Sequence, residues 1–203
     1  VVQAIHHVAC SDDLTIFVGA GSSHPSLVPR WKQLVQDVAT DCLVSSGISS
    51  HEATETADFL VASYGTMGTM AAMKRLVPST FVINAIRKHL YRNDPSPGPV
   101  PDLISAIAAR WSPRCHIVTT NYDDLLEVAL VRVIRRDSLR IEPVSICAAS
   151  ELEPLRSHGT DVTPVVHLHG FLPRGLDPRG KIQIGDDDYA ELNDADCWQN
   201  AYV

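Results

Sequence analysis

The chain has 203 residues, of which 45% are hydrophobic, so it can bury a large core and should fold as a globular protein. Its 24 acidic residues outnumber the 17 basic ones, and the net charge of -7 leaves no overall basic field to hold a nucleic-acid backbone. We therefore expect no direct nucleic-acid binding, and we interpret the arginines of residues 132–140 as the solvent-exposed face of a helix.

Cysteine usage and the lengths of the apolar runs point to a cellular compartment. The five cysteines form no CxxC pair, and their odd number predicts neither a disulfide framework nor a zinc ribbon. No apolar run approaches the roughly 20 residues of a membrane span, and the first residues lack the pattern of a signal peptide. We therefore expect a soluble, cytoplasmic protein without a membrane partner.

The first elements combine a strand with a glycine-rich turn. Hydrophobic spacing predicts a helix over residues 1–9, the buried strand "LTIFV" at residues 14–18 and a helix over residues 31–43. In the turn "GAGSS", residues 19–23, two glycines let the backbone approach a ligand, and N–H groups at a helix start favour a pyrophosphate. The third glycine of the dinucleotide fingerprint is replaced by His24, so a simple tight connection stays an alternative.

Helical patterns dominate the next stretch, and we expect a helical insertion over about residues 45–101. It ends in the proline-rich "DPSPGPVPD", interpreted as a return loop to the sheet, with a domain linker as the alternative. Further patterns predict helices at residues 103–111 and 123–136 and strands at residues 116–120, 139–146 and 165–169. This alternation predicts an α/β, Rossmann-like fold, with a parallel sheet covered by helices on both faces.

Two strand ends carry polar side chains. "TTNYDDLLE" places Asn121 and Asp123 where a strand ends and a helix begins, at the edge where ligands bind to a parallel sheet, although either residue could simply cap the helix. "VVHLHG" ends a strand with His167 and His169, which should point to the same face because they are two residues apart. That pair invites a metal interpretation, but no third ligand has a recognisable spacing, so we expect no metal site.

Taken in order, "GAGSS", "PRWKQL", "TTNYD", "HLHG" and "KIQIGDDDY" resemble the sirtuin-like superfamily, specifically its NAD-hydrolysing branch in bacterial anti-phage defence and related immune proteins. The resemblance covers about Thr15 to Tyr189, and its last segment is similar to the strand and acidic-tyrosine segment of that branch. It implies a single NAD-binding domain over residues 1–203, which we expect to be the N-terminal part of a longer protein.

The resemblance implies that the protein is an NAD+ glycohydrolase, which cleaves NAD+ to nicotinamide and ADP-ribose without a metal. By position in the family motifs, Asn121 would orient the ribose and the attacking water, His169 would act as general base, and Asp123 would hold the nicotinamide carboxamide. The residues implied to bind NAD are Gly19, Ala20, Gly21, Ser22, Thr120 and Asp123.

Departures from the family pattern and the remaining alternatives also follow from the sequence. Protein deacylation is disfavoured, because "HPSLVPRW" stands where deacylases have a "GIPDFR"-type segment and their paired CxxC motifs are absent. A catalytically weak NAD or ADP-ribose sensor stays open, as does a metal hydrolase built from His167, His169 and residues 186–188. A free NAD hydrolase would harm its own cell, so we expect a homo-oligomer or an activating partner or domain to gate the site.

Overall fold

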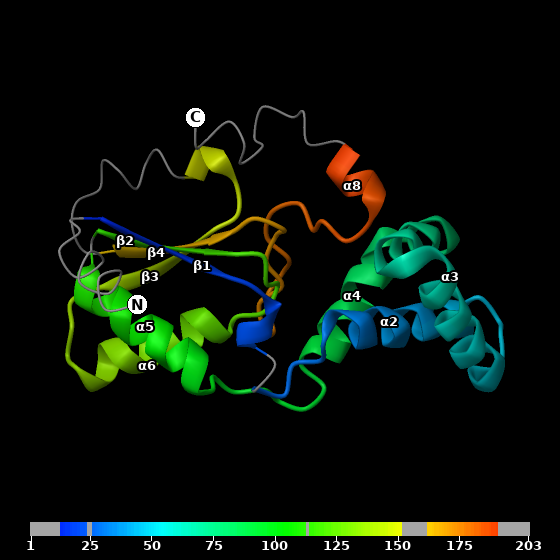
Figure 1. Cartoon of the computed structure of the whole chain (residues 1–203), viewed down its shortest axis with the longest axis horizontal. Helices are drawn as coiled ribbons and strands as arrows, with labels where there is room; N and C mark the ends of the chain where they lie inside the picture. The colour runs from blue at the N-terminus through cyan, green and yellow to red at the C-terminus, as the bar shows by residue number, and fades with distance from the viewer. Residues whose placement is uncertain (1–12, 24–25, 113, 152–161, 191–203) are drawn as a thin grey trace.

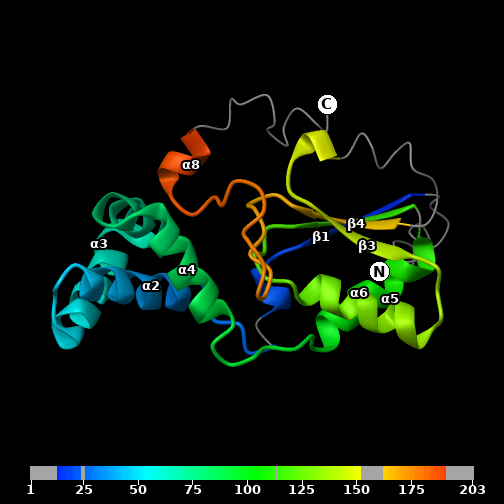
Figure 2. The ribbon, with the colours of Figure 1, turned by 180° about the vertical axis from the view of Figure 1, so that it is seen from behind.

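The computed structural model describes residues 13–23, 26–112, 114–151 and 162–190. Figure 1 shows two parts side by side, a parallel sheet with helices against one face and a bundle of helices, and Figure 2 shows the same arrangement from behind. The chain forms one strand, crosses to the helical part and then returns to complete the sheet. Segments far apart in the sequence therefore meet where the two parts join.

The sheet has four strands among the described residues, in the order β1-β2-β4-β3, and every neighbouring pair is parallel. The strands are β1 (Leu14–Val18), β2 (Cys115–Thr119), β3 (Glu142–Ile146) and β4 (Val162–His167). The predicted α/β class with a parallel, Rossmann-like sheet is confirmed. Among the described residues, α-helices lie against one face of the sheet, so helical cover of both faces stays a prediction. Thr119 is in register with both Val18 and His167, so three strands end at the same edge of the sheet.

Two helices, α5 (Pro99–Trp111) and α6 (Leu125–Arg136), pack against one face of the sheet (Figure 1). Their apolar sides share a buried cluster with Ile117 of β2, in which Leu130 of α6 is fully buried. Neighbouring residues of a strand point to opposite faces, and Val118 accordingly belongs to a smaller cluster on the other side of the sheet. The helix predicted over residues 1–9 lies outside the described residues.

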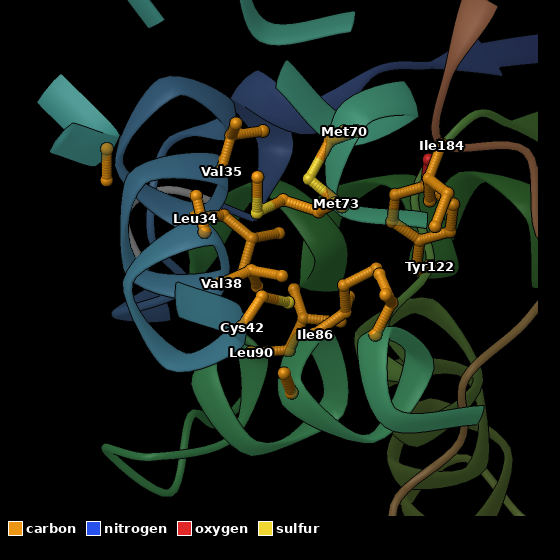
Figure 3. Close-up of a cluster of buried hydrophobic side chains, with 14 of the residues drawn as sticks. Leu34, Val35, Val38, Cys42, Met70, Met73, Ile86, Leu90, Tyr122 and Ile184 are labelled. Carbon is orange, nitrogen blue, oxygen red and sulfur yellow. The ribbon is translucent and has the colours of Figure 1, made fainter. Parts of the chain in front are cut away.

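The helical part consists of α2 (Trp31–Ser45), α3 (Ser50–Leu76) and α4 (Ser79–Leu90). Helices within residues 45–101 are confirmed by α3 and α4, but the helical part already begins at α2, before the predicted insertion. Its core lies between the three helices and extends to Tyr122 and Ile184 from the sheet part, as Figure 3 shows. Fully buried side chains there include Val38 and Ile86, which follow the apolar spacing of their helices. None of the helices in the described part of the chain is long and apolar enough to cross a membrane.

Helix α3 is long and kinked. It starts after Ser49, whose hydroxyl accepts a hydrogen bond from the main-chain N–H of Glu52 at 3.4 Å, a favourable N-cap. Gly65 interrupts the helical geometry with a φ of 70°, a conformation that glycine adopts without steric cost. The kink divides α3 into two segments, and the second segment carries Met67 towards the end of the sheet.

Two strand predictions were wrong in extent, and a third strand is absent at residues 181–184. β3 starts at Glu142 because the main-chain N–H of Leu139 donates to the carbonyl of Ile134, which completes the end of α6. β4 ends at His167, because the chain turns at the next residues. Residues 181–184, predicted as a strand by resemblance, form no strand, although the segment is anchored by main-chain hydrogen bonds.

Candidate active site

A pocket of about 190 Å³ lies at the carboxyl ends of β1, β2 and β4, where the sheet meets the helical part. Strand ends and their loops contribute Ala20, Ser23, Thr120, Asn121, Tyr122, Asp123 and His169. The helical part and the chain leading into it contribute Val28, Pro29, Trp31, Leu34, Met67 and Leu90. This is the edge at which open parallel sheets bind ligands. Polar groups thus come from the sheet side and an apolar wall comes from the helices.

Asn121 is held by hydrogen bonds through both its main chain and its side chain. Its main-chain N–H donates to the Thr119 hydroxyl at 3.0 Å, and its Nδ2 donates to the hydroxyls of Ser22 and Ser23 at 3.2 and 2.9 Å. Its Oδ1 is buried and receives no hydrogen bond from the described residues. A buried acceptor without a donor is costly, so this oxygen is suited to accept a hydrogen bond from a ligand.

Asp123 is a buried carboxylic acid with a perturbed pKa. Burial raises its pKa to about 6, and hydrogen bonds from Ser23 and from the main-chain N–H of Leu125 at 3.2 Å oppose that rise. Leu125 is the first residue of α6, so Asp123 also satisfies the start of this helix, as the capping interpretation proposed. The carboxyl group can therefore be present in both protonation states near pH 6.

His169 lies in the turn that follows β4 and lines the pocket. Burial lowers its pKa, so the imidazole is neutral near pH 7 and able to accept a proton. The next residue, Gly170, has a φ of 84°, and a Cβ there would lie 2.7 Å from Cδ1 of Ile182. Gly170 therefore fixes the direction of the chain directly after His169. The carbonyl of His169 accepts a hydrogen bond from the N–H of Gln183 at 3.0 Å.

The glycine turn differs from its prediction. It forms the 3-10 turn η1 (Ala20–Ser22), and α2 begins only at Trp31, so the expectation that the turn forms the start of the following α-helix is wrong. The binding of a pyrophosphate at this turn stays a prediction. The N–H and the hydroxyl of Ser22 both donate to the carbonyl of Gly19, at 3.0 and 2.9 Å. Both donors of Ser22 are therefore engaged within the turn.

Part of this turn nevertheless reaches the pocket. Ala20 lines it, together with Ser23, the residue that follows the predicted set. A Cβ built on Gly19 or Gly21 would meet no atom within 4 Å, so neither glycine is buried against the protein. Of the predicted NAD-binding residues, Ala20, Thr120 and Asp123 line the pocket, whereas Gly19, Gly21 and Ser22 stand beside it.

The two histidines of "HLHG" are separated, contrary to the expectation that they share one strand face. His167 is fully buried, with Nε2 2.7 Å from Oε1 of Glu127 and Nδ1 3.0 Å from the carbonyl oxygen of Asn121. His169 lies beyond the end of β4, where the strand geometry no longer applies. In the described parts of the chain, no three His, Cys, Asp or Glu side chains are grouped to hold a metal ion.

Several pocket residues were missed by the sequence reasoning. Trp31 and Tyr122 place their rings 6.0 Å apart, and the ring of Tyr122 is 6.5 Å from that of His169. The Tyr122 hydroxyl donates to the carbonyl of Gln183, which holds the ring in place. The sequence places Trp31 on an apolar helical face and in the motif "PRWKQL" but does not indicate that it lines the site, and no local signal connects Met67 with the strand ends.

The acidic segment after the histidine motif is structural. It forms α8 (Asp186–Ala190), in which Oδ1 of Asp188 lies 2.6 Å from Nζ of Lys74 on α3. The Asp188 Oδ2 accepts from the N–H groups of Ile184 and Gly185 at 2.9 and 3.0 Å. Burial would raise the pKa of Asp188, but these hydrogen bonds and Lys74 together lower it. The segment therefore attaches the chain after β4 to the helical part.

The part of the chain that carries Asn121, Asp123 and His169 is similar to a known protein family. A family model described as a SIR2-like domain matches residues 115–202, a range that starts at β2 and contains Asn121, Asp123 and His169. No curated protein sequence matches the chain. Proteins with SIR2-like domains use NAD and are typically NAD-dependent enzymes. The matched range, which is less than half of the chain, and the all-parallel sheet together support a sirtuin-like domain and suggest an NAD-related function.

Proposed function

We propose that this domain hydrolyses NAD+ at the bond between ribose and nicotinamide, releasing nicotinamide and ADP-ribose. The observation that carries the proposal is the Oδ1 atom of Asn121, which is buried without a donor among the described residues and belongs to a residue that lines the same pocket as His169. An amide oxygen and a neutral imidazole are the two acceptors needed to hold a ribose hydroxyl or a water molecule and to remove its proton.

The reaction requires three contributions from the protein. The glycosidic bond breaks through an oxocarbenium-like state, so the sugar must be oriented, the leaving group held and an acceptor delivered. In our proposal, Asn121 orients the ribose and the attacking water, and His169 takes a proton from water or from a ribose hydroxyl. Asp123 holds the nicotinamide carboxamide, for which a buried carboxyl group with a pKa of about 6 can supply either an acceptor or a donor.

The size and lining of the pocket fit one end of the dinucleotide. Sites that enclose an entire small ligand typically measure about 300–1,000 Å³, whereas this pocket measures about 190 Å³. It therefore suits the nicotinamide and part of its ribose, with Trp31 and Tyr122 offering aromatic faces. We place the diphosphate outside it, along Gly19 and Gly21, where the lack of a Cβ leaves the backbone accessible.

We further propose that the activity depletes NAD in anti-phage defence and that it is gated. The resemblance to defence proteins supports this role, and the gate follows because an ungated hydrolase would consume the NAD of its own cell. Assembly into a homo-oligomer or contact with an activating partner or domain would provide the gate in the cytoplasm. Equal specific activity at all protein concentrations, with or without the remainder of the protein, would contradict the gate.

Product chromatography of NAD+ incubated with the purified protein tests the proposed function. We expect equimolar nicotinamide and ADP-ribose, and activity that persists with a chelator because no proposed step uses a metal. Bound NAD or ADP-ribose without turnover at any protein concentration would instead assign a sensor. An NAD-dependent loss of acyl groups from lysine peptides, with acylated ADP-ribose as product, would assign the deacylase alternative.

A further inference from the structure

A buried ionisable pair that takes no part in the proposed chemistry lies directly behind the pocket. We propose that Glu127 and His167 form a positioning pair that holds the main-chain carbonyl of Asn121, and thereby fixes the Asn121 side chain in the pocket. The effect on turnover rests on the proposed NAD hydrolysis, whereas the effect on the position of Asn121 does not. Neither residue lines the pocket, so both act through Asn121.

The hydrogen bonds of His167 define where its protons lie. Its Nδ1 is 3.0 Å from the carbonyl oxygen of Asn121. A carbonyl oxygen can only accept, so Nδ1 carries a proton and donates it. Its Nε2 is 2.7 Å from Oε1 of Glu127, and this oxygen also accepts from the Ser145 hydroxyl at 2.8 Å. The ring is further fixed by Phe171, whose ring stacks on it at 4.2 Å between centroids.

The charges around the ring favour a doubly protonated imidazole. Burial would lower the pKa of His167, but the charge of Glu127, its hydrogen bond, the Asn121 carbonyl and the charge of Asp123 outweigh it and raise the pKa. The His167 side chain is fully buried and that of Glu127 is 13% exposed. A buried ion pair with further hydrogen bonds holds its members in one geometry, because breaking it leaves an uncompensated charge.

Asn121 depends on side chains for both of its main-chain hydrogen bonds. Thr119 accepts from its N–H, and His167 donates to its carbonyl. Its Nδ2 donates to the hydroxyls of Ser22 and Ser23 in the turn that follows β1. A shift of the carbonyl would therefore move Oδ1 relative to His169. A misplacement of about 1 Å in a catalytic group can cost about 100-fold in rate.

Two double variants isolate the hydrogen bond to the Asn121 carbonyl. The double variant Glu127→Gln, His167→Leu removes the group that donates to the Asn121 carbonyl. The double variant Glu127→Gln, His167→Asn restores a donor, because the asparagine side chain has a shape close to that of leucine but carries an amide N–H. Both remove the buried charge, so neither leaves an uncompensated charge in the interior, and unfolding curves should show that both are folded. His89→Phe is the control, because it breaks another buried pair, in which Nε2 of His89 lies 2.9 Å from Oδ2 of Asp41, away from the pocket.

We expect the leucine double variant to lose about 10–100-fold in kcat with KM within about threefold of the parent, because a group acting in the transition state is displaced. The asparagine double variant should recover most of this loss, and His89→Phe should retain the parent kcat. Without NAD, the NMR signals of the Asn121 side-chain amide, assigned by their loss in Asn121→Ala, should move in the leucine variant and return in the asparagine variant.

Equal kcat values and equal Asn121 amide shifts in the two double variants would overturn the positioning proposal. The imidazole nitrogen spectrum of the parent provides a test that needs no variant. Protons on both nitrogens of His167 at pH 7 are expected, and an unprotonated Nδ1 would refute the proposal. If the parent releases no nicotinamide, the proposed function fails, and the amide shifts and ring protonation alone decide whether the pair positions Asn121.

Discussion

Replacing Gly170 with alanine should destabilise the protein strongly, because two independent costs meet at this residue. Its φ is 84°, and a residue other than glycine in a left-handed conformation costs about 1–2 kcal/mol. The new Cβ would also lie 2.7 Å from Cδ1 of Ile182 and 2.7 Å from the carbonyl oxygen of Lys181. Relieving such overlap costs about 1–3 kcal/mol, so the free energy of unfolding should fall by about 2–5 kcal/mol.

Gly175 provides the matched control for this substitution. Its φ is 70°, but a Cβ there would meet no atom within 4 Å, so Gly175→Ala should cost only the conformational part of about 1–2 kcal/mol. Urea denaturation of both variants, followed by circular dichroism, measures the difference between them. Equal losses would refute the reasoning that the loop after His169 packs tightly against residues 181 and 182.

Three further predictions concern stability. Folding raises the pKa of Asp123 from 3.8 to about 6, so ionisation of this buried group destabilises the folded protein. The free energy of unfolding should therefore fall by about 3 kcal/mol between about pH 4 and pH 6 and stay lower above that range. Urea titrations should show this fall in the parent but not in Asp123→Asn. Arg174→Ala removes a 3.2 Å ion pair with Asp124, and chemical denaturation should show a loss of about 1–2 kcal/mol. By the same measurement, Ile86→Ala should cost about 2–5 kcal/mol, whereas Phe59→Ala, at a residue that is 63% exposed, should change stability by less than about 0.5 kcal/mol.

The strand ends were predictable because each carries a local signal. An apolar run that stops at polar residues marked the ends of β2 and β4 to within one and two residues, and parallel strands must end at the same edge of a sheet. The sequence therefore indicated that Asn121, Asp123 and His169 would lie together, and the structure places all three in one pocket. The same logic placed Ala20 there, from the end of β1.

The rest of the site depends on contacts between distant segments. The apolar wall comes from α2, α3 and α4, and the kink at Gly65 that carries Met67 to the pocket has no signature beyond a glycine within a helix. His167 and His169 are separated because β4 ends at His167 and the chain then turns, with a positive φ at Gly170. Glu127, read only as part of a helix, becomes the partner of His167 through packing of α6 on the sheet.

Nicotinamide release from NAD+ by the parent, Asn121→Ala and His169→Ala tests the central claim most directly. Loss of a general base costs about 100 to 10,000-fold, and we expect a loss of this size in kcat for each variant, with unfolding curves like those of the parent. Asn84→Ala and His51→Ala replace the same residue types at exposed positions and should retain the parent rate. Parent-like nicotinamide release by folded Asn121→Ala and His169→Ala would contradict the account, because the cleavage would then take place without the two acceptors on which it rests.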